Sequence, residues 1–286
     1  MKSFLCLIIF MIQMIFLHNL CGHARAASLI LSVDFDTSMQ LNRYPTFLDD
    51  PYNNAVYHFF KKQYLRNNPA IIPPQEELLI PKKIHWIWLG SPLPEIYTSN
   101  IQSWIDKNPG WEYKIWTDAD VEDFQLINKN LFDAIPNYGA KSDIWRYEIL
   151  ERFGGLYVDI DQECLQAFTP LHHTYHFYTG LQPLDTGRLH SGISIIGSMP
   201  HHPILKKCIE QLPHYQQEPE VIIKTGPLFF TDMLFLTARQ SSLHTIVFPA
   251  SYFFPCNYTQ KGQAQALWIK PESYAVHHWA GSWLDI

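Results

Sequence analysis

Two acidic residues at the end of an apolar strand are the residues of this sequence best placed to do chemistry. Asp159 and Asp161 are separated by one residue and close the run GGLYVDID, which begins at Gly154. Residues 156–160 are predicted to form a buried strand, and ligands of open α/β sheets bind beyond the carboxyl ends of strands. Carboxylates at such a position suit Mn²⁺ or Mg²⁺, with open coordination positions left for water and a diphosphate. Taken alone, a D-x-D pair is equally typical of a solvated turn.

A helix just upstream carries a second pair of charged residues. Asp143 and Arg146 are three residues apart, so they share one face of the helix predicted over residues 140–152. As an exposed ion pair they would contribute little to stability. This face, however, leads through the glycine turn at 153–155 into the acidic strand. We therefore expect Asp143 and Arg146 to reach the same pocket as the two aspartates.

The elements around these residues alternate between strands and helices. A short apolar run predicts a strand over 84–89, and alternation of polar and apolar residues predicts another over 111–116. A helix is predicted between them over 94–107. Together with the helix over 140–152 and the strand over 156–160, this alternation predicts an α/β domain with a mostly parallel sheet.

The first residues have the layout of a secretory signal. Lys2 precedes an apolar run from Phe4 to Leu17, and the motif Ala24-Arg25-Ala26 follows. Residues 1–26 are therefore predicted to be a signal peptide or a signal-anchor. The apolar run is shorter than the roughly 20 residues that a bilayer span needs, which favours the cleaved form.

The composition predicts a packed protein with a large core. Hydrophobic residues make up 47% of the chain and charged residues 17%, which excludes wholesale disorder. A net charge of -6 without a run of Lys or Arg excludes a general nucleic-acid binder. Residues 27–79 are predicted to be a stem or lead-in segment with a helix over 54–65, and residues 80–286 the catalytic domain.

Four segments together resemble glycosyltransferase family 32, which contains a DXD sugar-binding region. Its members include initiating α-1,6-mannosyltransferases and inositol-phosphorylceramide mannosyltransferases. The segments are PKKIHWIW at 81–88, SDIWRY at 142–147, GGLYVDID at 154–161 and HHWAGSW at 277–283. The resemblance spans about 200 of the 286 residues. It implies the GT-A type of fold, in which helices flank a Rossmann-like, mostly parallel sheet in a single catalytic domain.

The resemblance also implies roles for individual residues. The implied catalytic residues are Asp143, Arg146 and Asp161. The implied donor-binding residues are Trp86, Trp88, Asp143, Arg146, Tyr147, Asp159 and Trp283. The implied metal ligands are Asp159, Asp161 and one of His277 and His278, with His277 favoured. Thr225-Gly226-Pro227 is a further family landmark, although such a triplet is also ordinary loop punctuation.

The implied reaction is metal-dependent transfer of a hexose from a nucleotide sugar, with retention of anomeric configuration. GDP-mannose or a UDP-hexose is the expected donor, with mannose favoured over galactose and glucose, and a glycan or lipid hydroxyl is the expected acceptor. Many relatives carry an Asn before the apolar stretch that ends at Gly197-Ser198, whereas Ser191-Gly192-Ile193-Ser194 stands here, which leaves the sugar open. A leader on such an enzyme indicates a Golgi-type lumen, membrane association or export rather than the cytosol.

Two other functions remain open at this point. A glycoside hydrolase also uses paired carboxylates, but these flank the scissile bond at least about 5 Å apart, unlike a D-x-D pair aimed at one cation. A secreted carbohydrate-binding protein with an inactive transferase core is the other alternative. The intact acids and Arg146 argue against it, and metal-dependent release of a nucleoside diphosphate distinguishes the two.

Overall fold

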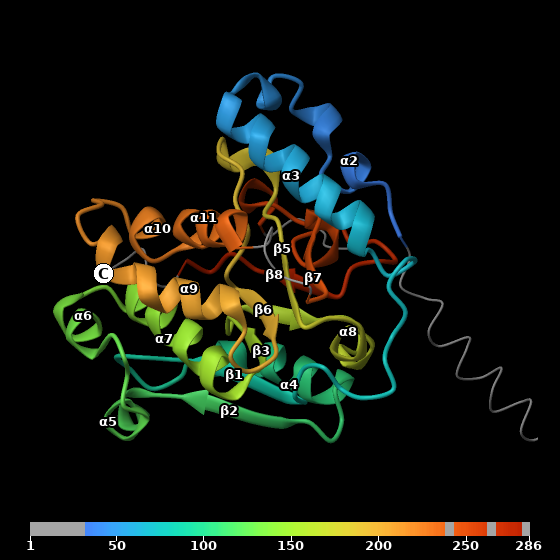
Figure 1. Ribbon diagram of the computed structural model, residues 1–286. Helices are drawn as coiled ribbons and strands as arrows, with labels where there is room; N and C mark the ends of the chain where they lie inside the picture. The colour runs from blue at the N-terminus through green and yellow to red at the C-terminus, as the bar shows by residue number, and fades with distance from the viewer. Residues whose placement is uncertain (1–31, 238–242, 262–266, 282–286) are drawn as a thin grey trace, which may run out of the picture.

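The computed structural model describes residues 32–237, 243–261 and 267–281 of the chain (Figure 1). The predicted signal segment at 1–26 and Trp283 lie outside the described residues. In the part of the chain that is described, no helix combines the length and the apolar character needed to cross a membrane.

A six-stranded sheet in the order β2-β1-β3-β6-β5-β7 forms the centre of the molecule (Figure 1). Its strands are β1 (Lys83–Ile87), β2 (Glu112–Trp116), β3 (Gly155–Val158), β5 (Phe177–Gly180), β6 (Ile195–Ser198) and β7 (Thr245–Phe248). Strand β6 is antiparallel to β3 and β5, and the other neighbours are parallel. Five strands therefore share one direction. The predicted α/β class with a mostly parallel sheet is confirmed.

Burial explains why several strands are uninterrupted apolar runs. Every residue of β3, β5, β6 and β7 is buried, as expected for strands covered on both faces. The edge strand β2 is different, because it exposes its first three residues and carries charged side chains there.

Helices pack around this sheet and leave its β2 edge uncovered (Figure 1). The longer ones are α3 (Pro51–Asn67), α4 (Thr98–Lys107), α7 (Tyr138–Phe153), α9 (Pro203–Gln211) and α11 (Pro227–Thr237). The shorter ones are α2 (Phe35–Ser38), α5 (Val121–Phe124), α6 (Lys129–Ala134), α8 (Thr169–Thr174) and α10 (Val221–Lys224). The predicted helices over 94–107 and 140–152 are confirmed, although α4 begins later because residues 95–97 form a 3-10 turn.

Helix α7 delivers the charged residues to the site. The Asn137 side chain caps its first turn by accepting from the backbone N–H of Ala140. Gly154 ends the helix, and Gly154 and Gly155 adopt φ angles of 60° and 100°, which disfavour residues with a side chain. A Cβ atom on Gly155 would also lie 2.7 Å from the Lys83 carbonyl oxygen. The two glycines therefore allow the chain to turn back tightly from α7 into β3.

The segment before residue 80 packs onto the same core as the sheet. Helix α3 contacts β7 and lies with α2 over one end of the sheet (Figure 1). Its side chains Val56, Tyr57 and Phe60 are buried in the common hydrophobic core. The predicted helix over 54–65 is confirmed within longer bounds, while the domain boundary near residue 80 stays a prediction.

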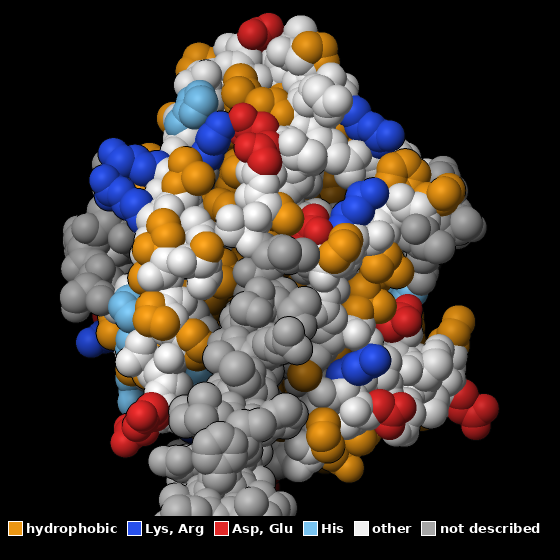
Figure 2. All heavy atoms as spheres, turned by 90° about the vertical axis from the view of Figure 1, so that its right-hand side faces the viewer, with side chains coloured by type: hydrophobic (Ala, Val, Ile, Leu, Met, Phe, Trp, Pro, Cys, Tyr) orange, Lys and Arg blue, Asp and Glu red, His pale blue; other side chains and the backbone are white. Residues whose placement is uncertain are grey.

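The face of the molecule drawn in Figure 2, the right-hand side of Figure 1, mixes both signs of charge. Figure 2 shows Lys and Arg side chains interspersed with Asp, Glu and hydrophobic groups over this face. Neither sign forms a continuous patch on the described part of this face.

Candidate active site

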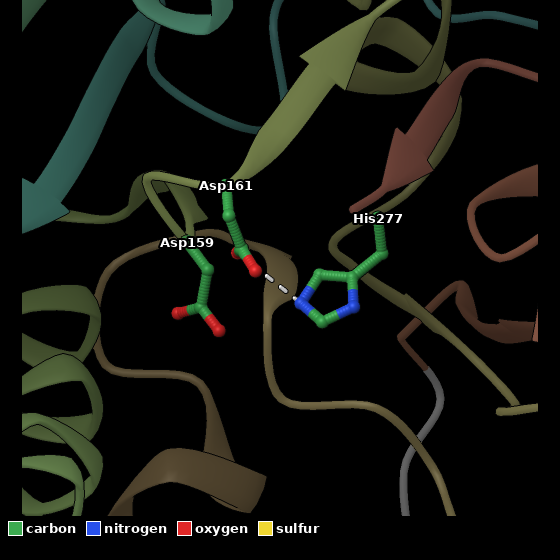
Figure 3. Close-up of side chains that lie close together, drawn as sticks. All are labelled: Asp159, Asp161 and His277. Carbon is green, nitrogen blue, oxygen red and sulfur yellow. Dashed lines mark ion pairs between the residues drawn. The ribbon is translucent and has the colours of Figure 1, made fainter. Parts of the chain in front are cut away.

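The D-x-D residues form the turn between two strands of different sheets. Strand β3 ends at Val158, and β4 (Gln162–Cys164) begins directly after Asp161. The Gln162 N–H donates to the Asp159 carbonyl at 3.0 Å, which closes the turn. The Asp159 N–H donates to the Ser194 carbonyl at 2.8 Å and thereby anchors the turn beside β6. Both carboxylates consequently face the same space (Figure 3).

A small second sheet brings a histidine to this turn. Strand β4 pairs antiparallel with β8 (Ala275–His277), and the register sets Gln162 opposite His277. His277 Nε2 lies 3.2 Å from Asp161 Oδ1 (Figure 3). One ligand atom each from Asp159, Asp161 and His277 lies within 4.8 Å of the others. Residues more than a hundred positions apart in sequence thus form one compact group.

The structure separates the two adjacent histidines. Because neighbouring side chains of an extended segment point to opposite faces, His278 turns away from the aspartates. Its Nε2 atom lies 3.2 Å from Glu163 Oε2, on the other side of the small sheet. Of the two histidines that the sequence left open, His277, the favoured one, shares the group with Asp159 and Asp161.

Asp161 and His277 shift each other's pKa in opposite directions, lowering that of the carboxyl and raising that of the imidazole. Burial by itself would raise the pKa of Asp161, but His277 and the Ala280 N–H hold it at about 2. Burial by itself would lower the pKa of His277, but the Asp161 carboxylate raises it above its ordinary value. The Ala280 N–H donates to Asp161 Oδ2 at 2.8 Å. Each of these interactions stabilises the charged forms in a nearly buried place.

Arg146 connects helix α7 with the acidic turn. Its Nη1 atom donates to Asp159 Oδ1 at 3.1 Å and to the Ile193 carbonyl at 2.8 Å. Its Nη2 atom lies 3.0 Å from Asp143 Oδ1, and its guanidinium stacks on the Tyr157 ring at 4.4 Å. The expectation that Asp143 and Arg146 reach the region of the two aspartates is met by this bridging guanidinium.

Asp143 acts on this region through Arg146 rather than by facing open space. It is 5% exposed, and Arg146 and the Thr225 hydroxyl occupy its two carboxylate oxygens. Burial raises the pKa of Asp143 to about 6, although Arg146 and the Thr225 hydroxyl act in the opposite direction. Direct contact of Asp143 with a sugar would require one of these partners to leave.

Sequence reasoning missed Tyr157 as a member of the site. Its hydroxyl donates to Asp159 Oδ1 at 2.7 Å, and its ring faces the Arg146 guanidinium. A signal for it existed, because Tyr157 lies two positions before Asp159 on an extended chain, where alternate side chains share a face. The aromatic ring and the hydroxyl fix both charged neighbours.

The remaining predicted donor-binding residues fall into different environments. Trp86 is fully buried, so the structure corrects it to a core residue of a strand covered on both faces. Tyr147 is also fully buried; its hydroxyl donates to the Thr225 carbonyl at 2.7 Å, and its ring stacks on Phe230. Trp88, just beyond the carboxyl end of β1, is half-buried beside Tyr97.

The chemistry of the three clustered residues fits a divalent cation. Two carboxylates and one imidazole supply hard oxygen and borderline nitrogen ligands, which suit Mn²⁺ and similar ions. Three protein ligands leave coordination positions for a substrate, as in metal sites that act on bound molecules. Among the described residues, this is the group of acidic and histidine side chains with the spacing for a metal ion.

The fold and the site define a class of protein: an α/β protein with an acidic D-x-D turn at the carboxyl end of a central strand of its sheet. Residues 94–178 match the family model described as "Glycosyltransferase sugar-binding region containing DXD motif". The resemblance stated from the sequence is confirmed over this region, in which residues 94–178 are similar to the sugar-binding region of that family.

Two curated relatives and one solved structure are similar to parts of the chain. The chain is 29% identical over 195 residues to "Inositol phosphoceramide mannosyltransferase 3" of Schizosaccharomyces pombe, covering 64% of this chain and 48% of the relative. It is 32% identical over 168 residues to "Mannosyl phosphorylinositol ceramide synthase SUR1" of Saccharomyces cerevisiae, covering 56% and 42%. A structure titled "PaToxG Glycosyltransferase" superposes with a TM-score of 0.47 at 20% identity, covering 68% and 80%. The chain spans about half the length of these two curated relatives.

Proposed function

We propose that this protein is a metal-dependent, retaining glycosyltransferase that moves a hexose from a nucleotide sugar to a hydroxyl group. The observation that carries the proposal is the convergence of Asp159, Asp161 and His277 within 4.8 Å of one another. The match of residues 94–178 to a glycosyltransferase sugar-binding region supports it independently.

Asp159, Asp161 and His277 would hold the cation, Mn²⁺ or Mg²⁺. Its chemical contribution when bound is to offset the negative charge that develops on the departing nucleoside diphosphate. Asp161 is suited to ligation because the Ala280 N–H donates to Oδ2 and favours the ionised carboxylate, while Oδ1 faces His277. Asp159 is the more exposed acid, with 29% of its side chain accessible, and it faces the space from which a donor would approach.

Arg146 would supply a second positive charge fixed before the reaction begins. Its guanidinium is nearly buried and is held by Asp159, Asp143 and a backbone carbonyl. Charges preorganised in this way stabilise developing negative charge without a reorganisation cost, which is usually the largest catalytic contribution. Asp143 and Tyr157 would act by orienting Arg146 and Asp159.

The aromatic side chains near the carboxyl end of β1 would receive the nucleotide. Trp88 is half-buried beside Tyr97, and its Nε1 atom donates to the Ser91 hydroxyl at 3.1 Å. An indole with one face accessible is suited to stack on a nucleobase. Trp283, predicted to close over the donor, keeps that role as part of the proposal.

The relatives favour mannose as the sugar and a glycolipid as the acceptor. Both curated relatives are named for mannosyl transfer to inositol phosphoceramide. We therefore place GDP-mannose first among the donors and UDP-hexoses second, and a lipid acceptor before a glycan. A signal peptide or signal-anchor at residues 1–26 would deliver the enzyme to the secretory pathway or a membrane, where such acceptors occur.

Retention of configuration would follow from attack by the acceptor hydroxyl on the face that the diphosphate leaves. The acceptor O–H bond breaks, the new glycosidic C–O bond forms, and the proton passes to the departing phosphate oxygen. Nuclear magnetic resonance of the product reports its anomeric configuration directly. An inverted product, or a trapped covalent glycosyl-enzyme adduct, would refute this part of the proposal.

The deciding experiment measures nucleoside-diphosphate release by the full chain from GDP-mannose, UDP-glucose, UDP-galactose and UDP-N-acetylglucosamine. Each donor is tested with Mn²⁺, with Mg²⁺ and with chelator. We expect release from one donor that chelator abolishes and that Asp161→Ala lowers by about 1000-fold, because the ion loses its buried carboxylate ligand.

Glu163→Ala is the matched control, because Glu163 lies two residues further on and pairs with His278 on the opposite face. We expect this variant to keep its activity within about 3-fold, as is usual for a change outside the reacting groups. Absence of release from every donor, together with absence of metal-dependent nucleotide binding, would favour the carbohydrate-binding alternative.

A further inference from the structure

Thr225 lies buried at the junction between two helices of the second half of the chain. It follows α10 directly and stands two residues before Pro227, the first residue of α11. Its exposed fraction is 0%. The Thr225-Gly226-Pro227 triplet is also typical of an ordinary loop between two helices. Nothing in the sequence connects it to the D-x-D turn.

The Thr225 side chain reaches a charged residue of α7 that is 82 positions away in sequence. Its hydroxyl donates to Asp143 Oδ2 at 2.9 Å. The same hydroxyl is 3.5 Å from the Val221 carbonyl, too far to compete well for its single proton. The Thr225 carbonyl in turn accepts from the Tyr147 hydroxyl at 2.7 Å, so the backbone on which the hydroxyl is mounted is itself tied to α7.

The contact continues from Asp143 to the acidic turn. Arg146 Nη2 lies 3.0 Å from Asp143 Oδ1, so the carboxylate is held at both oxygens and has a single orientation. The other terminal nitrogen of Arg146 lies 3.1 Å from Asp159 Oδ1. Three short polar contacts therefore connect the α10–α11 turn to one of the proposed metal ligands.

We propose that Thr225 is a positioning residue, whose hydroxyl orients the Asp143 carboxylate and thereby fixes the Arg146 guanidinium beside Asp159. The inference rests on the proposed function for its kinetic consequences. It connects the second half of the chain, which carries α10 and α11, to the charge that would stabilise the leaving group.

Removing the hydroxyl leaves a buried carboxylate with an unfilled acceptor position. Such a group either turns towards another donor or takes up a proton, and burial already raises the pKa of Asp143 to about 6. In both cases the contact between Asp143 and Arg146 weakens. The guanidinium then gains freedom to leave Asp159, while the fold around it remains closed by apolar packing.

The first test compares Thr225→Val with Thr225→Ser in the full chain. Valine matches threonine in shape without the hydroxyl, and serine restores the hydroxyl. We expect Thr225→Val to lower kcat for donor turnover by about 10- to 100-fold with little change in KM, as for loss of a hydrogen bond to a charged group. Thr225→Ser should stay within about 3-fold of the wild type, since the bond is kept.

Thr174→Val is the matched control for loss of a buried threonine hydroxyl. Thr174 is 0% exposed, and its hydroxyl donates to the Pro170 carbonyl at 2.8 Å within α8, away from the acidic turn. We expect its kcat to stay within about 3-fold of the wild type, because only a local bond within one helix is lost. A fall equal to that of Thr225→Val would assign the effect to general destabilisation and overturn the inference.

A double-mutant cycle separates positioning from local helix capping. If Thr225 acts through Asp143, the effects of Thr225→Val and Asp143→Asn on log kcat are not additive, because both disrupt one connection. Additive effects would mean that the hydroxyl serves only the end of α10, and would overturn the inference.

A spectroscopic readout tests the positioning without any substrate, so it remains decisive if the proposed function fails. The Arg146 Nε–H donates to the Ser142 carbonyl at 3.3 Å, and its nitrogen-15 resonance can be assigned by its loss in Arg146→Lys. We expect slow hydrogen exchange at this group in the wild type and Thr225→Ser, and exchange at least about 10-fold faster in Thr225→Val. Equal exchange in all three proteins would overturn the inference.

Discussion

Two sets of buried polar side chains in this molecule find their partners in opposite ways, one as charged groups and the other as uncharged groups. One lies at the acidic turn and is built from ions, with Arg146 between Asp143 and Asp159. The other, the neutral network, consists of two separate uncharged histidines in the core, His85 on β1 and His172 on α8, each with its own hydrogen-bond partners. All five side chains except that of Asp159 are nearly or fully buried, so burial alone does not explain the difference.

In the neutral network, each histidine finds a hydrogen-bond partner for both ring nitrogens in its uncharged form. The Trp116 indole N–H donates to His85 Nδ1 at 3.2 Å, so the proton of His85 is on Nε2, which lies 3.0 Å from the Gly154 carbonyl. His172 likewise matches Nδ1 with the Ile80 carbonyl and Nε2 with the Tyr178 hydroxyl. Burial lowers the pKa of His85 to about 4 and that of His172 to about 3. Neither ring needs a charge.

The charged network is satisfied by pairing instead. Arg146 keeps its charge because Tyr157, Asp159 and Asp143 outweigh the effect of burial and raise its pKa. Buried ions of this kind add little net stability compared with apolar residues, but breaking such a pair is costly. The comparison teaches that the neighbouring groups, rather than burial alone, decide whether a buried histidine or carboxyl group carries a charge. The network that retains its charges is the one that opens to solvent at Asp159.

The largest expected effect divides the two adjacent histidines. His277→Gln should lower donor turnover by about 1000-fold, since it removes a proposed ligand of the cation, whereas His278→Gln should change it by less than about 3-fold. Initial rates of nucleoside-diphosphate release at saturating Mn²⁺ measure both. Equal losses in the two variants would mean that histidines on both faces of β8 contribute to activity, and would contradict the assignment of His277 alone.

The next effect tests whether the shape of Arg146 matters or only its charge. Arg146→Lys should lower kcat by about 100-fold, because a lysine ammonium cannot reach Asp143, Asp159 and the Ile193 carbonyl together. Steady-state kinetics with the preferred donor measure this. Arg152→Lys is the control on the same helix, where the guanidinium contacts the Phe124 and Gln125 carbonyls, and its kcat should stay within about 3-fold.

The smallest effect concerns the neutral network and its response to acid. Unfolded histidine binds a proton below about pH 6.5, whereas folded His85 resists protonation down to about pH 4. The unfolded state thus binds more protons in this window, and the free energy of unfolding falls as the pH falls through it. His85→Gln removes one such proton, so its stability relative to the wild type should improve by about 2 kcal/mol from pH 7 to pH 4.5.

Urea unfolding of the wild type and His85→Gln at pH 7, 6, 5 and 4.5 measures this difference. The comparison predicts that the two curves converge on acidification. A constant gap between them across this range would show that His85 is not held neutral, and would remove the distinction between the two networks.

Much of the fold followed from local sequence patterns. The apolar runs predicted β1 and β3, because strands buried on both faces need continuous hydrophobic side chains. The spacing of Asp143 and Arg146 predicted their common face on α7, because helical residues three apart are neighbours. Strands β4 and β8 were not foreseen, because three-residue strands carry too short a pattern to recognise.

The sequence by itself determined the acidic turn, the helix that carries Arg146 and the class of the sheet, since each depends on residues close together in the chain. Only the tertiary structure decided between His277 and His278, through the β4–β8 register. It also decided that Trp86 packs in the core and that Thr225 holds Asp143. The physical reason is the same for all three. Strand register and side-chain burial are set by contacts between distant segments, and no local pattern of residue types specifies them.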